Sequence, residues 1–66
     1  MKVIINGEER EVSPDVTVSG LLREIGTEET RVAVEVNLEV VPRQEYSRTR
    51  VREGDSIEVV SFVGGG

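Results

Sequence analysis

Residues 2–12 read KVIINGEEREV, and this stretch indicates how the fold begins. The residues before Asn6 are mostly β-branched, which favours a strand. Asn6-Gly7 is a pair that readily adopts the positive φ values of a tight type I′ turn. The polar second arm, residues 8–12, suits an edge strand that faces water, and it ends before Pro14 because proline has no N–H to donate to a sheet. The stretch therefore predicts an N-terminal β-hairpin.

The next segment changes to a helical period. Its apolar residues follow the i, i+3, i+4, i+7 spacing of one helix face: Val18, Leu21, Leu22 and Ile25. Thr17 can cap the start of this helix, and Gly26 can end it in the left-handed conformation. Gly20 lies inside the predicted helix, where glycine lowers helix stability by about 1 kcal/mol relative to Ala. An alternative reason for this glycine is close packing of the helix on a sheet.

The second half of the chain predicts a second hairpin and a last strand. Residues 32–36 alternate in polarity as a half-buried strand does, and residues 37–39 turn into a short partner strand that Pro42 closes. The following residues, 43–50, show no clear period and are expected to form a loop or a single-turn helix. A turn at residues 53–55 leads into a final strand, residues 56–62.

These elements follow the order β-β-α-β-β-β, which belongs to the α+β class. Two hairpins, one helix and a final strand most simply form a mixed sheet with the helix packed on one face. The last strand is expected in the middle of the sheet, beside the first. This is the β-grasp arrangement of ubiquitin-like proteins.

Composition restricts the functions that the chain can perform. With 66 residues, 36% hydrophobic and 3% aromatic, it is one small domain with an aliphatic core. It has no Cys and no His, so we expect no enzyme activity of its own, no metal site and no cofactor. Eight Lys and Arg against thirteen Asp and Glu give a net charge of −5, which disfavours nucleic acid and anionic membranes. Without a long apolar run or a signal peptide, we expect a cytoplasmic protein that is monomeric when free.

The final strand carries apolar residues on both of its faces. If Ile57 and Val59 point into the core, Val60 and Phe62 point outward and form a small apolar patch close to the C-terminus. One interpretation is a β-bulge that turns Val60 inward, or an apolar side chain that is simply left exposed. The functional interpretation is a docking surface for a partner.

The chain ends in three glycines, Gly64, Gly65 and Gly66. Because glycine has no Cβ, such a segment can extend through a narrow channel and present its terminal carboxylate to an enzyme. A carboxylate with a pKa of about 3.5 is anionic and unreactive at neutral pH, so another enzyme must activate it, most simply as an acyl adenylate. We therefore expect residues 1–63 to form the β-grasp domain and residues 64–66 to form a flexible, reactive tail.

Taken in order, several segments resemble the ThiS family of sulfur carriers along the whole chain: Asn6-Gly7-Glu8, Thr17-Val18 with Leu21-Leu22, and residues 32–37, 40–43, 53–60 and 63–66. The resemblance implies that an E1-like (ThiF-type) enzyme adenylates Gly66 with ATP. A thiocarboxylate then forms with sulfur drawn from a cysteine desulfurase, and a ThiG-type thiazole synthase uses that sulfur for the thiazole ring of thiamine. Gly65 would be the spacer that enters the active site, and Gly64 matches the family less specifically.

Two alternatives are open. Molybdopterin-synthase small subunits and Urm-like carriers share the Gly-Gly end and the activation chemistry, whereas in a TGS-like or ubiquitin-like interaction module the tail is unreactive. The single Lys2 argues against a chain-forming ubiquitin. Half of the basic residues form a cluster that we interpret mainly as a solvated, charge-balancing face, with partner recognition as the other interpretation: Arg43, Arg48, Arg50 and Arg52.

Overall fold

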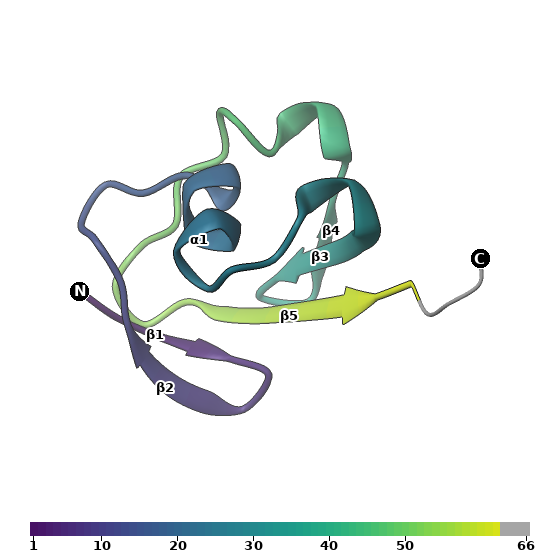
Figure 1. Cartoon of the computed structure of the whole chain (residues 1–66). Helices are drawn as coiled ribbons and strands as arrows, with labels where there is room; N and C mark the ends of the chain where they lie inside the picture. The colour runs from purple at the N-terminus through teal and green to yellow at the C-terminus, as the bar shows by residue number, and fades with distance from the viewer. Residues whose placement is uncertain (63–66) are drawn as a thin grey trace.

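The computed structural model describes residues 1–62, whose strands form a five-stranded sheet. Along the chain the elements are β1 (Lys2–Ile5), β2 (Glu8–Glu11), α1 (Val18–Glu24), β3 (Val32–Val36), β4 (Glu39–Val41) and β5 (Ser56–Ser61), with short 3-10 helices at Glu29–Arg31 and Arg43–Glu45. The strand order is β2-β1-β5-β3-β4, with α1 on one side of the sheet (Figure 1). β5 pairs parallel with β1 and antiparallel with β3. This is the mixed sheet that the sequence predicts.

The N-terminal hairpin forms as expected. Asn6 has a φ of 51° and Gly7 a φ of 84°, which are the left-handed values of a type I′ turn. β1 and β2 pair antiparallel up to this turn, with Ile5 opposite Glu8. All four residues of β2 are exposed, and β2 lies at the edge of the sheet, which suits its polar sequence.

Helix α1 begins and ends at the residues that its sequence indicates. The backbone N–H of Gly20 donates to Oγ1 of Thr17 at 3.2 Å, so Thr17 caps the first turn. At the other end Gly26 has a φ of 78°. The N–H groups of Gly26 and Thr27 donate to the carbonyls of Arg23 and Leu22 at 3.1 and 2.9 Å, the pattern of a Schellman motif.

The position of Gly20 has a different cause from the predicted one. A Cβ built at Gly20 would lie 2.6 Å from Cγ2 of Val16, a side chain in the segment just before α1. The close approach is therefore between the first turn of the helix and the chain that leads into it, and not between the helix and the sheet. An alanine at this position would force Val16 to move.

The core lies between α1 and the sheet. Its buried residues include eight at apolar positions of the predicted strands and helix: Val3, Ile5, Val18, Leu21, Leu22, Val32, Val34 and Ile57. Ile25, Val36 and Val59 are only partly buried and pack against this cluster. The core also contains four residues that the periodicity does not identify: Val12, Val41, Tyr46 and Val51. Within residues 1–62, no helix has the length and apolarity needed to cross a bilayer.

The structure differs from the prediction at several points. The segment before β3, to which the sequence pattern assigns no element, contains the 3-10 helix Glu29–Arg31, and β2 ends at Glu11, one residue earlier than expected. The second hairpin turns on two residues, Asn37 at φ 51° and Leu38 at φ 72°, so Glu39 belongs to β4. β5 ends at Ser61, one residue earlier than expected.

Candidate functional site

The two faces of β5 have different environments. Ile57 is buried and Val59 is partly buried on the inner face, which packs against α1. Val60 and Phe62 are each 57% exposed. The pairing of β3 with β5 runs without a break from Val36 opposite Ile57 to Val32 opposite Ser61. The predicted outward orientation of Val60 is therefore correct, and the unbroken register excludes the bulge.

The backbone at the end of β5 is held on its β3 side. Val60 lies opposite Ala33 in the antiparallel ladder. One residue past the strand, the N–H of Phe62 donates to the carbonyl of Arg31 at 2.9 Å. Phe62 thus combines a fixed backbone with an exposed aromatic side chain, an arrangement that limits the conformational entropy lost when a partner covers the ring.

A further exposed residue belongs to the same face of the sheet. Val40 on β4 lies opposite Glu35 and is 71% exposed. Periodicity does not single it out, but adjacent strand residues point to opposite faces, so Val40-Val41 had to place one valine outside the core. We call the following set the outer-face patch: Ala33, Val40, Val60 and Phe62.

Two carboxylates border this patch. Glu35 on β3 and Glu58 on β5 are directly opposite each other, and Val40 flanks Glu35 on the other side. Like charges in directly opposed positions destabilise a sheet. Within residues 1–62 neither carboxylate takes part in an ion pair. The outer face therefore combines exposed apolar side chains with an uncompensated negative charge.

The arginine cluster forms local contacts. Arg48 lies 3.3 Å from Glu45, and Arg50 lies 3.7 Å from Asp15. The guanidinium of Arg43 donates to the carbonyl of Thr30 at 3.4 Å. Arg48 and Arg50 thus pair with acids and Arg43 with a carbonyl at the surface, which favours the charge-balancing interpretation for three of the four arginines.

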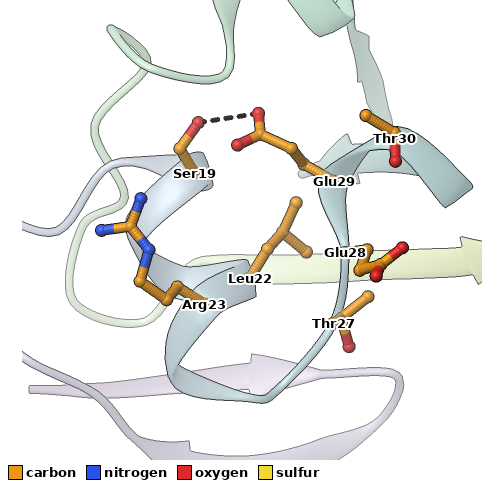
Figure 2. Close-up of a pocket in the computed structure, with 7 residues that line it drawn as sticks. All are labelled: Ser19, Leu22, Arg23, Thr27, Glu28, Glu29 and Thr30. Atoms are coloured by element: carbon orange, nitrogen blue, oxygen red, sulfur yellow. Dashed lines mark hydrogen bonds between the residues drawn. The ribbon is translucent and has the colours of Figure 1, made fainter.

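A shallow pocket of about 400 Å³ lies between α1 and the 3-10 helix at Glu29–Arg31 (Figure 2). Its wall includes Leu22 and Arg23, and Oγ of Ser19 donates to Oε1 of Glu29 at 3.1 Å across it. None of the candidate site residues lines this pocket. In the described part of the chain, no three His, Cys, Asp or Glu side chains gather to form a metal site. The outer-face patch is therefore the stronger candidate for a functional surface.

The predicted reactive residues Gly64, Gly65 and Gly66 lie outside the described residues. Their role and their flexibility are predictions. The two predicted partner-binding residues, Val60 and Phe62, are on the outer face and belong to the segment that precedes this tail in the sequence.

The amino-acid sequence is similar to those of known proteins. The ThiS family model matches residues 3–66. A thiazole synthase from Paramagnetospirillum magneticum is 52% identical over 66 residues, which are 100% of this chain and 20% of that protein. A sulfur carrier protein ThiS from Bacillus subtilis is 35% identical over 63 residues, which cover 94% of this chain and 96% of that one.

Solved structures include a close match to the fold. The crystal structure of a thiamine biosynthesis protein (ThiS) from Geobacter metallireducens matches with a TM-score of 0.84 and 33% identity, over 100% of both chains. The similarity therefore covers both sequence and architecture. The chain spans only 20% of the length of the first two relatives that it matches.

Proposed function

This chain belongs to the ThiS family, and on that premise we propose that it is a sulfur carrier protein of thiamine biosynthesis. The observation that carries the proposal is the family match, which extends through the terminal glycines of a chain with the matching β-grasp fold. In the proposed cycle a carboxylate oxygen of Gly66 attacks the α-phosphorus of ATP and pyrophosphate leaves. A persulfide sulfur on the sulfur donor then displaces AMP from the acyl carbon and forms an acyl disulfide. A thiol attacks the outer sulfur of that disulfide, releases the thiocarboxylate and is itself oxidised to a disulfide.

The chain acts in this cycle as substrate and carrier. Its sequence has no His and no Cys, so it lacks the usual general base and the thiolate nucleophile. Activation therefore falls to an E1-like (ThiF-type) adenylating enzyme. A sulfur donor such as a cysteine desulfurase supplies the second step. Gly65 and Gly64 serve as the spacer that brings Gly66 into the active site of the adenylating enzyme.

We propose a ThiG-type thiazole synthase as the acceptor of the sulfur. Two relatives named thiazole synthase contain a segment that aligns with this entire chain at 52% and 44% identity. That segment makes up 20% of each protein. Covalent linkage raises the effective concentration of one module near another, which favours successive steps of one reaction sequence. The combination supports a functional connection between this domain and thiazole synthesis.

The outer-face patch is proposed as the docking surface for these enzymes. Phe62 and Val60 supply exposed apolar area at the end of β5, and Val40 on β4 adds apolar area on the other side of β3. The opposed carboxylates Glu35 and Glu58 favour a partner whose apolar contact is bordered by Lys or Arg. Apolar side chains that become buried at an interface centre contribute most of the affinity, whereas rim charges mainly set association rate and salt dependence.

The proposal can be tested by carrier-dependent exchange of labelled pyrophosphate into ATP. A ThiF-type enzyme should catalyse this exchange only when the 66-residue chain presents its Gly66 carboxylate. A non-reactive ubiquitin-like or TGS-like module would support no exchange, and that result would refute the carrier function. Sulfur transfer to thiazole synthase, compared with transfer to the large subunit of molybdopterin synthase, separates the ThiS assignment from related carriers.

A further inference from the structure

Two asparagine side chains hold β5 through their amides. Asn6 and Asn37 are each the first residue of a two-residue hairpin turn, and each has a φ of 51°. Oδ1 of Asn6 accepts the N–H of Val59 at 2.8 Å, and its Nδ2 donates to the carbonyl of Val59 at 3.2 Å. Oδ1 of Asn37 accepts the N–H of Ser56 at 3.0 Å, and its Nδ2 donates to Oδ1 of Asp55 at 3.0 Å. The two turns therefore hold the same strand at two places, at its first residue Ser56 and further along at Val59.

The side-chain amide of Asn6 continues the hydrogen bonding between β1 and β5 beyond the point where the backbone of β1 turns away. β1 pairs with β5 up to Ile5 opposite Ile57, and the N–H of Asn6 still donates to the carbonyl of Ile57 at 2.8 Å. The chain then turns into β2, so β1 has no further peptide to offer to Val59. The side-chain amide supplies both the acceptor and the donor that the next peptide of a longer β1 would supply.

Asparagine suits this position for two reasons. It tolerates the left-handed conformation better than most residues with a Cβ, which the type I′ turn requires. Its side-chain amide also carries an acceptor oxygen and a donor nitrogen on the same carbon. It can therefore form hydrogen bonds with both the backbone C=O and the backbone N–H of one residue. Gly would satisfy the turn and lose both bonds, whereas Asp would keep the acceptor and place a second oxygen against the carbonyl of Val59.

We infer that Asn6 is a positioning residue: its amide fixes β5 at Val59, and with it the placement of the residues that follow, Val60 and Phe62. On the β3 side the last residues of β5 are held by the ladder and by Arg31. On the β1 side, among residues 1–62, the Asn6 side chain provides the bonds to Val59. This inference rests on the proposed function, because an enzyme must engage the patch and Gly66 in one complex. A poorly fixed strand end lowers the fraction of molecules that are competent for this step.

The chain offers a matched pair of variants to test the role. Asn6→Gly and Asn37→Gly both keep a residue that adopts positive φ. Each removes two side-chain hydrogen bonds, at Val59 in the first variant and at Asp55 and Ser56 in the second. The Asn37 bonds are at the start of β5, at Asp55 and Ser56, and not in the later part of the strand that leads to Val60 and Phe62. A general loss of fold stability would affect both variants, whereas a loss of positioning would affect Asn6→Gly alone.

Two readouts are expected to separate the variants. Hydrogen exchange of the Val59 amide should become about tenfold faster in Asn6→Gly, and the amide NMR signals of Val60 and Phe62 should shift, with neither change in Asn37→Gly. The kcat/KM for adenylation by a ThiF-type enzyme should fall about tenfold in Asn6→Gly and by no more than about twofold in Asn37→Gly. Asn6→Asp should show an intermediate loss because it retains the acceptor for Val59.

The possible outcomes distinguish this inference from the proposed function. Equal loss of kcat/KM in the two glycine variants, or unchanged Val59 exchange in Asn6→Gly, would overturn the positioning role. If the unmodified chain supports no adenylation at all, the proposed function fails. The comparison of Val59 exchange and of the Val60 and Phe62 signals then still decides whether Asn6 fixes β5 at Val59.

Discussion

Replacing Phe62 by alanine should weaken enzyme binding strongly and leave the fold almost unchanged. Phe62 is 57% exposed in the free chain, so about 110 Å² of an aromatic residue of about 200 Å² is available for a partner to cover. At about 25 cal/mol per Å², covering that area contributes about 3 kcal/mol, which corresponds to about 100-fold in Kd. The free energy of unfolding should fall by no more than about 1 kcal/mol, because the residue lies past the end of β5 with its ring largely in solvent.

The assay compares two quantities for each variant: the Kd for a ThiF-type enzyme by calorimetry, and the thermal stability of the free protein. Arg48→Ala is the control, since Arg48 is an exposed side chain in an ion pair with Glu45. It should change the response of binding to ionic strength and little else. If Phe62→Ala unfolds the domain, Phe62 is part of the core. If it binds as tightly as the unsubstituted chain, the outer-face patch is not the docking surface.

Three other substitutions test separate parts of the structure. Leu22→Ala should lower the free energy of unfolding by about 2 to 5 kcal/mol in chemical denaturation, because Leu22 is 1% exposed; a melting curve that does not move would remove it from the core. Glu58→Gln should raise that free energy by about 0.5 kcal/mol, because it relieves the repulsion from Glu35, and should reduce the salt dependence of enzyme binding; lower stability would contradict the repulsion. Hydrogen bonds from the side chain and backbone of Ser13 lower the pKa of Glu24, so the folded state favours its carboxylate. That stabilisation is present above the ordinary glutamate pKa of about 4.3 and is lost as pH falls through the lowered pKa. Glu24→Gln should therefore reduce the loss of unfolding free energy on the acid side of a pH profile measured by denaturation. An unchanged profile would contradict this assignment.

The parts of the fold that the sequence predicts are those with local causes. The Asn6-Gly7 turn, the Thr17 cap and the Gly26 end of α1 each depend on residues a few positions apart, and each forms as expected. The outward orientation of Val60 and Phe62 follows from strand alternation, which is also a local property.

The features that the sequence does not predict depend on contacts between distant segments. Tyr46 lies in an aperiodic segment and is buried because its hydroxyl donates to the carbonyl of Val32 at 3.2 Å and its ring joins the core. Val51 enters the core beside the segment before α1, where its N–H donates to the carbonyl of Val16 at 2.9 Å. No periodic pattern in residues 43–52 reports these contacts.

The candidate functional site likewise combines features with local causes and features that depend on distant segments. Periodicity indicates which face of β5 Val60 occupies, but the juxtaposition of Glu35 and Glu58 depends on the register of two strands that lie far apart in sequence. The contact of Asn6 with Val59 joins residues 53 positions apart and requires the parallel pairing of β1 with β5. Such features become visible only when the register is known.

The most direct test of the carrier function is the intact mass of the chain after reaction with ATP, a ThiF-type enzyme and a sulfur donor. Replacing one carboxylate oxygen by sulfur should add about 16 Da, and fragmentation should place the gain on Gly66, because only the adenylated acyl group is a good enough electrophile. A chain extended by one alanine after Gly66 should not gain this mass, because a Cβ then stands on the reacting residue and the arm is longer. Equal modification of the extended chain, or no gain on Gly66 of the original chain, would contradict the account.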